Sequence, residues 1–431
     1  MNILTYTSLY PSPGNPVHGI FVSQLTHALA RLTRMRVVVP ENGLVQFLKR
    51  GQGSFPRLTA TPRPGTIRTL ERASEDFSGH PLEGFSDHAF EVARCRFWTV
   101  PKVLKFLDYR LMAFFSRATV SRALSHGVDL VHAHYAYPDA AAANLLARRF
   151  GLPLVVTCHG SDLNVLAKYP ARGRIIGRTL RQASAVAAVS GALVRAIEGL
   201  GVPPDRIHHI PNGVDLARFP LGDKKEARKR LGLPEHAALI VAAGRLEPVK
   251  GFDRLLRALV LLDNVRLILV GDGGLAKPLK RLAQELGVKD RVRFTGMVPH
   301  DVLAPYFQAA DALVMASESE GWPTVIHEAL ACGTPVAAPA VGGIPEALDV
   351  SPGYRERIDS PLIGSPLGLV LPSSEPEILA RGIREVLGRV FDQHDLRQAA
   401  SLHGWDAVAR RYVDLFERVL RQSGPKRQEA A

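Results

Sequence analysis

The sequence is poor in cysteine and has no long apolar run. Its 431 residues include three cysteines, Cys95, Cys158 and Cys332, which lie far apart without metal-ligand spacing. This pattern argues against a disulfide framework or a zinc site and favours a reducing compartment. The most apolar window, residues 255–270, is interrupted by charged and polar residues. It therefore cannot supply the roughly 20 apolar residues of a transmembrane helix.

Two further absences narrow the class of protein. Residues 1–10 read as a strand without the basic region of a signal peptide, so we expect a cytoplasmic protein. No Gly-x-Gly-x-x-Gly segment precedes the first expected helix. That segment binds dinucleotides, so its absence disfavours an oxidoreductase with a nicotinamide cofactor.

Acidic residues are fewer than basic ones, 41 against 54, which gives a formal net charge of +13. Basic surfaces attract nucleic acids, anionic membranes or anionic substrates. The basic residues are not interleaved with a regular aromatic series, so we expect no nucleic-acid partner. Two readings stay open. One is an ordinary solvated surface, and the other is an enzyme held at an anionic membrane surface, peripheral to the inner face of the plasma membrane.

What remains is the pattern of an α/β protein. Residues 1–7 have the composition of a buried strand, a loop rich in proline and glycine follows, and residues 20–32 have helical spacing. The same order begins again with a strand at residues 237–243 and a helix from Phe252. A chain of 431 residues is long enough for two such halves. We therefore predict two doubly wound α/β domains.

The region between the first strands is less regular. Residues 41–96 have poor periodicity, and we predict long connections with little regular structure there. Residues 106–124 have the spacing of an amphipathic helix, for which packing on the core is favoured over a membrane contact. His132 and His134 stand one strand period apart and could bind a metal, but no third ligand is implied, so a structural role is favoured.

Residues 317–337 are the most informative stretch. Pro323 and Gly333 have the positions typical of the start and end of a helix. Glu320 is then expected in the loop at the carboxyl end of a strand, and Glu328 in the second turn of the helix. In open α/β sheets, ligands bind at this edge.

With its surroundings, this stretch resembles the Glu-x7-Glu motif of the retaining glycosyltransferases of family 4, which have the GT-B fold. The resemblance implies that Glu320 holds hydroxyls of a donor sugar and that Glu328 holds the ribose of its nucleotide. Ionised carboxylates suit both tasks because they only accept hydrogen bonds. The alternative is an ordinary helix start, where the helix dipole favours acidic residues. Donor contacts are also implied for the residues that follow Glu320: Gly321, Trp322, Pro323 and Thr324.

A second run, residues 244–251, is similar to the loop that grips the donor diphosphate in this family. The resemblance assigns Arg245 and Lys250 to the stabilisation of the departing diphosphate, a task that suits preorganised cations. Exposed loop cations are the alternative. Gly19 resembles the glycine that lets a donor phosphate approach backbone N–H groups, and a simple tight turn is the alternative there.

Further positions follow from the same resemblance. His159, at the end of a predicted strand, is expected beside the sugar or its leaving phosphate, and Asp162 is expected on the acceptor side. A buried structural histidine is the alternative for His159. Asn212, in a Pro-Asn-Gly turn, is also placed on the acceptor side. The nucleobase is expected near Gly271, Gly273 and Val298.

The resemblance covers residues 1–40 and 125–420 and implies two Rossmann-like domains that face a central cleft. We predict an acceptor-side domain over residues 1–217, a donor domain over 218–400, and a helix over 401–422 that crosses back to the first domain. The implied activity is transfer of a sugar from a UDP- or GDP-sugar to a hydroxyl of a glycan or lipid-linked acceptor in cell-surface polysaccharide biosynthesis. No cofactor and no divalent metal are expected.

Two alternatives to this function stay open. A relative with the same fold could be a sugar-phosphate synthase or a nucleotide-sugar epimerase. A protein of another class could be a basic scaffold that binds a membrane or nucleic acid without catalysis.

Overall fold

The structure is a computed structural model that describes residues 1–12, 15, 17–43, 90–99, 104–350 and 362–424. The chain forms two compact units. Unit 1 comprises Met1–Val189, Leu193–Ile210 and Val408–Ala431, and unit 2 comprises Ser190–Ala192 and Pro211–Ala407. The chain thus crosses from one unit to the other mainly at residues 210–211 and 407–408. The predicted domain boundaries were residues 217–218 and 400–401.

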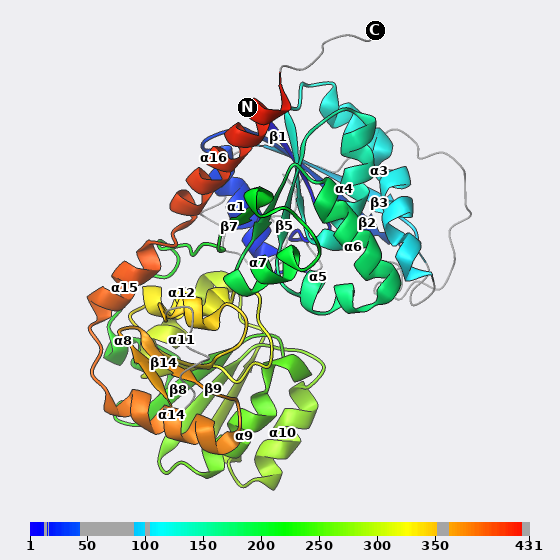
Figure 1. Ribbon diagram of the computed structural model, residues 1–431. Coiled ribbons are helices and arrows are strands. Elements are labelled where there is room, and N and C mark those ends of the chain that lie inside the picture. The colour runs from blue at the N-terminus through cyan, green and yellow to red at the C-terminus, as the bar shows by residue number, and fades with distance from the viewer. Residues whose placement is uncertain (13–14, 16, 44–89, 100–103, 351–361, 425–431) are drawn as a thin grey trace. The chain divides into compact units, whose positions relative to one another are not determined.

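Unit 1 contains a parallel sheet of seven strands in the order β3-β2-β1-β4-β5-β6-β7 (Figure 1). The strands are β1 (Asn2–Tyr6), β2 (Arg34–Asn42), β3 (Glu91–Phe97), β4 (Leu130–His134), β5 (Leu154–Cys158), β6 (Ala185–Ala188) and β7 (Ile207–His209). The strand order reverses between β1 and β4, which makes this the switch point of the sheet.

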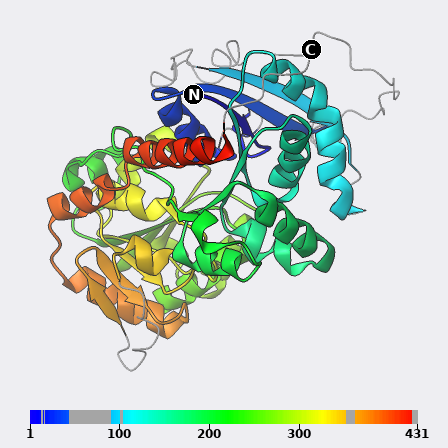
Figure 2. The ribbon, with the colours of Figure 1, turned by 45° about the horizontal axis from the view of Figure 1, so that its top comes forward.

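Helices cover both faces of the first sheet. They are α1 (Ile20–Ala30), α3 (Asp108–Leu124), α4 (Ala141–Arg149), α5 (Ser161–Asn164), α6 (Pro170–Gln182), α7 (Gly191–Glu198) and α16 (Trp405–Ser423). Helix α4 packs against both α3 and α6, and these three helices lie side by side (Figure 1). Helices α1 and α16 lie together on the other face (Figure 2). The last helix belongs to unit 1 from Val408 onward.

Unit 2 repeats this plan with the strand order β10-β9-β8-β11-β12-β14-β13. The strands are β8 (Ala238–Ala243), β9 (Val265–Val270), β10 (Val292–Gly296), β11 (Ala312–Val314), β12 (Val336–Pro339), β13 (Ile363–Ser365) and β14 (Gly368–Leu371). All pairs are parallel except β13 with β14. The switch point lies between β8 and β11. The predicted α/β class with two doubly wound halves is therefore confirmed.

The helices of unit 2 are α8 (Lys224–Leu231), α9 (Phe252–Val260), α10 (Ala276–Glu285), α11 (Ala304–Ala309), α12 (Thr324–Ala331), α13 (Ile344–Ala347), α14 (Pro376–Gly388) and α15 (Gln393–Ser401). Helices α9, α10 and α14 share a large apolar core with the strands of the sheet. Strand β8 reads Ala-Leu-Ile-Val-Ala-Ala, with its four middle residues buried. Such an unbroken apolar run is typical of a parallel strand covered on both faces.

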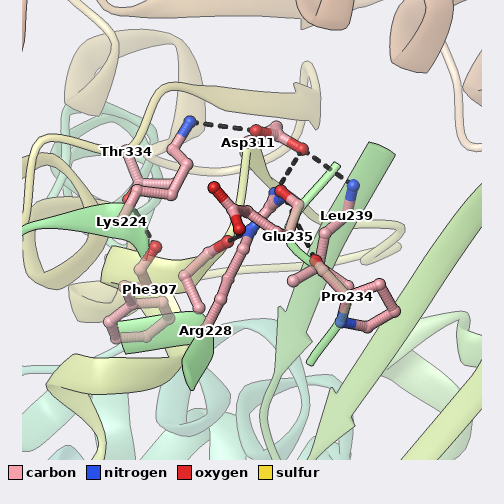
Figure 3. Close-up of polar contacts among 9 residues, drawn as sticks. Lys224, Arg228, Pro234, Glu235, Leu239, Phe307, Asp311 and Thr334 are labelled. Carbon is pink, nitrogen blue, oxygen red and sulfur yellow. Dashed lines mark hydrogen bonds and ion pairs between the residues drawn. The ribbon is translucent and has the colours of Figure 1, made fainter. Parts of the chain in front are cut away.

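Asp311 of unit 2 is the centre of a network of hydrogen bonds and ion pairs (Figure 3). One carboxylate oxygen of Asp311 accepts hydrogen bonds from Arg228 Nη2 at 2.9 Å and from the backbone N–H of Leu239 at 2.8 Å. The other accepts one from Lys224 Nζ at 2.9 Å. Arg228 also donates to the carbonyl oxygens of Ala309 and Glu235, and its side chain is only 5% exposed. The network joins α8 to the strand β8 and to the chain between α11 and β11.

The elements that were not predicted from the sequence include β3, α15 and the short edge strand β13. β3 lies in the region expected to lack regular structure, and it pairs in parallel with β2 at the edge of the sheet. Its residues, Glu-Val-Ala-Arg-Cys-Arg-Phe, carry three charges that obscure the strand pattern. The unpredicted helix α15 is short and polar, and Asp392 caps it through the backbone N–H groups of His394 and Asp395. Residues 44–89, most of the predicted long connections, lie outside the described part of the chain.

Within the described residues, the structure contains no helix that is both long enough and apolar enough to cross a lipid bilayer.

Candidate functional site

Two loops meet at the switch point of the second sheet. One follows β8 over residues 244–251, and the other follows β11 over residues 315–323. The backbone N–H of Glu318 donates to the carbonyl of Val249 at 2.9 Å, which fixes one loop against the other. Gly251 has a φ of +62°, and a Cβ there would lie 2.2 Å from the carbonyl oxygen of Ala316. Glycine is therefore required for this close approach.

Lys250 and Glu320 form an ion pair at this junction. Lys250 Nζ lies 2.6 Å from Glu320 Oε1, and the side chains are 23% and 10% exposed. Sequence analysis predicted both residues at the site but not their contact with each other. Hydrogen bonds between oppositely charged groups are shorter and stronger than those between neutral groups. The pair thus places a cation and hydrogen-bond-accepting oxygens together at the carboxyl ends of β8 and β11.

Glu328 extends the site along α12. Its Oε1 lies 3.1 Å from His300 Nε2, and Arg218 donates from Nη1 to His300 Nδ1 at 3.3 Å. Arginine cannot accept a hydrogen bond, so Nδ1 is the acceptor and Nε2–H donates to Glu328. His300 thereby orients the carboxylate. This role was not predicted, because a single histidine two residues beyond Val298 belongs to no sequence motif.

The residues between the two glutamates are held mainly by packing. Trp322 is buried and stacks on the ring of His327, with centroids 5.2 Å apart and an interplanar angle of 18°. Pro323 is the N-cap residue of α12, and Thr324 is its first helical residue. Gly321 contributes its carbonyl to a close approach with Gly343, where an added Cβ would lie 2.6 Å away.

The predicted diphosphate and nucleobase residues lie nearby in the same unit. Gly271 and Gly273 follow β9, and added Cβ atoms there would lie 1.9 Å from the carbonyl of Gly244 and 2.7 Å from that of Leu246. Val298 lies in the loop after β10. Arg245 is 77% exposed, and the structure pairs it with Glu247 at 3.1 Å. The structure thus gathers Lys250 and Glu320 in one contact, and Arg245 extends into solvent.

In unit 1, Gly19 lies at the switch-point loop after β1. It is the N-cap residue of α1 with a φ of +65°. A Cβ at this position would lie 2.4 Å from the carbonyl carbon of Leu9. The packing of its own loop therefore requires glycine at this position. Binding of a donor phosphate by the backbone N–H groups at Gly19 remains a prediction.

His159 lies directly after β5 within a group of three histidines. His134 Nδ1 lies 3.1 Å from His159 Nε2, and the rings of His132 and His134 have centroids 4.2 Å apart. His132 bonds through Nε2 to Thr157 Oγ1, which in turn contacts the hydroxyl of Tyr412 at 3.1 Å. His132 and His134 are buried, as the favoured structural role requires. The sequence did not predict their proximity to His159.

Burial controls the charge of these histidines. It lowers the pKa of His132 to about 3 and lowers those of His134 and His159 below the ordinary value. Among the described residues, no group of three His, Cys, Asp or Glu has a metal-binding arrangement. At neutral pH, His159 is therefore an uncharged ring, and its Nε2 contacts His134.

The two residues predicted on the acceptor side are both buried. Asp162 accepts hydrogen bonds from the backbone N–H groups of Ala136 at 3.0 Å and Gly160 at 2.8 Å, and also from those of His159 and Leu163. Its carboxylate thus shapes the turn that carries His159. Asn212 is buried in the loop after β7, at the start of the main segment of unit 2.

Comparison with known proteins identifies the family. A family model described as Glycosyltransferase Family 4 matches residues 19–218, and one described as Glycosyl transferases group 1 matches residues 223–402. A putative teichuronic acid biosynthesis glycosyltransferase, TuaC of Bacillus subtilis, is 33% identical and covers 80% of this chain and 82% of its own. The chain belongs to glycosyltransferase family 4. The predicted family is thus confirmed.

One further relative and one solved structure are also similar to this family 4 glycosyltransferase. A D-inositol 3-phosphate glycosyltransferase of Salinispora arenicola is 31% identical over 73% of this chain and 74% of its own. The crystal structure of Anabaena Alr3699/HepE in complex with UDP superposes with a TM-score of 0.69 at 20% identity, covering 97% of this chain and all of that one. The second likeness shows the fold, and with the two parallel sheets it confirms the predicted GT-B class.

We expect His300→Ala to raise the KM of the glycosyltransferase for its sugar donor by about 10-fold, because Glu328 loses the partner that orients it. Its kcat should change much less, because His300 acts through Glu328 rather than on the reacting atoms. His300→Gln, which keeps an N–H donor, should recover part of the loss. Steady-state kinetics against donor concentration measure both constants. An unchanged donor KM in a folded His300→Ala variant would contradict the role.

A second prediction concerns Asp139, which sequence analysis did not select. Its carboxyl accepts a hydrogen bond from the backbone N–H of Ser8, and burial raises its pKa to about 7, helped by the nearby charge of Asp162. The folded glycosyltransferase then retains a proton that the unfolded chain, with a pKa near 3.9, releases. This group's contribution to stability therefore falls as pH rises from about 4 to 7.

Asp139→Asn imitates the protonated carboxyl and removes this titration. We expect the free energy of unfolding of the wild-type protein, relative to that of Asp139→Asn, to decrease between pH 5 and pH 7 and to level off above about pH 8. Urea unfolding at a series of pH values measures the difference. A difference that stays constant between pH 5 and pH 8 would show that the carboxyl is already ionised.

Proposed function

We propose that this family 4 glycosyltransferase transfers a sugar from a UDP- or GDP-sugar to a hydroxyl of a glycan or lipid-linked acceptor, with retention of the anomeric configuration. The observation that carries the proposal is the ion pair between Lys250 and Glu320 at the switch point of the second sheet, 2.6 Å between the charged atoms. Ligands of open α/β sheets bind at this edge.

The proposed chemistry uses the charges of this pair. When the bond between sugar and diphosphate breaks, negative charge develops on the leaving oxygen, and Lys250 stabilises it at short range. Glu320 accepts hydrogen bonds from sugar hydroxyls, and Glu328, oriented by His300, accepts those of the ribose. Arg245 is 77% exposed, so it is free to turn toward the diphosphate when the donor arrives.

Unit 1 is proposed to contribute two groups. Gly19 offers backbone N–H groups near the start of α1 for a phosphate oxygen. His159, neutral at pH 7, donates one hydrogen bond to the sugar or to the leaving phosphate. We assign no general base, because Asp162 is saturated by backbone N–H groups and Glu320 is paired with Lys250. The leaving phosphate is proposed to take the acceptor's proton during attack on the same face of the sugar.

The relatives suggest two classes of acceptor. The name of TuaC points to a cell-surface polysaccharide, which we favour. The name of the Salinispora relative points to a phosphorylated polyol instead, a reaction close to that of a sugar-phosphate synthase. No divalent metal is proposed at the diphosphate, because Lys250 and Arg245 supply the positive charge.

Transfer assays with product analysis test this proposal. The enzyme is incubated with UDP- or GDP-sugars and either polysaccharide precursors or polyol phosphates, with EDTA present throughout. We expect release of one nucleoside diphosphate that depends on the acceptor, and NMR of the product should show the anomeric configuration of the donor. An inverted product would reject retention. Interconversion of nucleotide-sugars without transfer would indicate an epimerase, and no turnover with any donor would favour a non-enzymatic scaffold.

A further inference from the structure

Helix α3 of unit 1 presents large apolar side chains to solvent. Leu111, Phe114 and Phe115 are 38%, 56% and 36% exposed. In the turn that precedes the helix, Leu104 is 58% exposed and Phe106 is 40% exposed. The opposite face of the helix is buried through Met112, Ala113, Ser116 and Val120. Exposed apolar groups that gather on one element mark an interaction site more often than scattered ones do.

The same exposed face is cationic. Arg110 and Arg117 lie beside the aromatic residues, and the guanidinium carbon of Arg117 is 4.6 Å from the ring centroid of Phe114. The one acidic residue of the helix, Asp108, is paired with Lys105 at 2.8 Å. Arg110 and Arg117 are therefore exposed to a binding partner, and Lys105 neutralises the charge of the Asp108 carboxylate.

Helix α6 adds charge on the same face of the sheet, where α4 packs against both helices (Figure 1). Its sequence, Pro170–Gln182, contains four arginines and no acidic residue. Tyr169, just before it, is 55% exposed and lies under the guanidinium of Arg172 at 4.8 Å. Aromatic and arginine side chains thus recur together along this side of unit 1.

We propose that the α3 surface, defined as Leu104, Phe106, Arg110, Leu111, Phe114, Phe115 and Arg117, docks the protein on an anionic lipid bilayer. An amphipathic helix with aromatic and aliphatic residues on one face binds at the boundary of headgroups and acyl chains. Arginines beside them meet lipid phosphates, and charge complementarity thereby selects an anionic leaflet. The inference does not depend on the proposed function, although it would bring a lipid-linked acceptor within reach.

Vesicle co-sedimentation tests the proposal. The full-length protein is mixed with vesicles of phosphatidylglycerol and phosphatidylcholine, or of phosphatidylcholine alone. We expect binding to the anionic vesicles that weakens as salt is raised, and little binding to the neutral ones. Equal binding to both vesicle types, or to neither, would overturn the proposal.

Matched variants separate the α3 surface from the general charge of the protein. Arg110→Glu with Arg117→Glu should weaken binding to anionic vesicles by about 10-fold or more. Lys277→Glu with Arg281→Glu, on exposed positions of α10 in unit 2, changes the net charge equally and should weaken it less than about 2-fold. Phe114→Ser with Phe115→Ser leaves the charge unchanged and should also weaken binding by about 10-fold. Equal losses in the α3 and α10 charge variants would overturn the assignment.

Two further measurements keep the outcome decisive. Each variant must retain the melting temperature of the wild type, which is expected because the substituted residues are exposed. Sedimentation velocity then tests the competing occupant, a second copy of this chain. A wild-type dimer that Phe114→Ser with Phe115→Ser converts to a monomer would show that α3 is a subunit interface and overturn the proposal. Turnover with a soluble acceptor should be unchanged in these variants, so failure of membrane docking leaves the transfer reaction separately testable.

Discussion

Lys250→Met is expected to lower the kcat for sugar transfer by about 10²–10³-fold, the usual effect of removing one preorganised charge that stabilises a developing anion. The Nζ group lies 2.6 Å from Glu320 Oε1, at the edge of the sheet where a diphosphate would leave. Methionine keeps most of the length of the side chain without the charge. Nucleoside diphosphate release at saturating donor measures the effect.

The two partners of this ion pair should not act independently. Glu320→Gln removes a carboxylate oxygen that is proposed to accept a hydrogen bond from the donor sugar, and it leaves Lys250 without its counter-charge. This variant should therefore also lower kcat strongly. The double variant should be little worse than the poorer single variant, because groups that act as a unit are non-additive. Lys277→Met, at an exposed position of α10, is the matched control and should keep normal turnover. Near-normal turnover in Lys250→Met and Glu320→Gln would refute the site.

The second large effect is expected on stability. Arg228→Met should lower the free energy of unfolding by about 2–3 kcal/mol, because it leaves buried and partly buried oxygens without their donor. The side chain of Arg228 is 5% exposed and donates to Asp311 (Figure 3). It also donates to the carbonyl oxygen of Ala309. Without it, these carbonyl and carboxylate oxygens lose a buried donor. Urea unfolding of the full chain, followed by tryptophan fluorescence, measures the loss.

Two further variants assign this loss to the network. Asp311→Asn should also destabilise strongly, and the combined variant should lose less than the sum of the two single losses, because the residues share one interaction. Arg230→Met, an exposed position on the same helix α8, should change stability by less than about 0.5 kcal/mol. A loss below about 1 kcal/mol in Arg228→Met would show that water satisfies the exposed oxygens.

Much of the site was predictable because it is local in sequence. The helix between Pro323 and Gly333 and the loop position of Glu320 follow from turn and cap chemistry over a few residues. The order of a buried strand, a loop and a helical pattern predicted both doubly wound units for the same reason. Lys250 and the glycine after it were expected from the resemblance to family 4. Local rules also place the two loops at the carboxyl ends of strands, where the structure brings them together.

The unpredicted parts are contacts between residues distant in sequence. His300 meets Glu328 across 28 positions, His134 meets His159 across 25, and Arg228 meets Asp311 across 83. None of these residues has a periodic or motif signal, because only the strand order decides which loop ends become neighbours. The exposure of Phe114 was also unpredictable, because an amphipathic pattern shows the buried face and not what covers the other one.

The most direct test of the central claim is thermal unfolding in the presence of UDP, GDP, ADP or NAD, each with EDTA. The account predicts that one nucleoside diphosphate raises the melting temperature, with about 2.7 kcal/mol of added stability at 100 times its dissociation constant. The same ligand should raise the melting temperature of Glu328→Gln much less, because this variant has lost a carboxylate oxygen that accepts a hydrogen bond from the ribose. A shift with NAD alone, or no shift with any nucleoside diphosphate, would contradict a nucleotide-sugar site in unit 2.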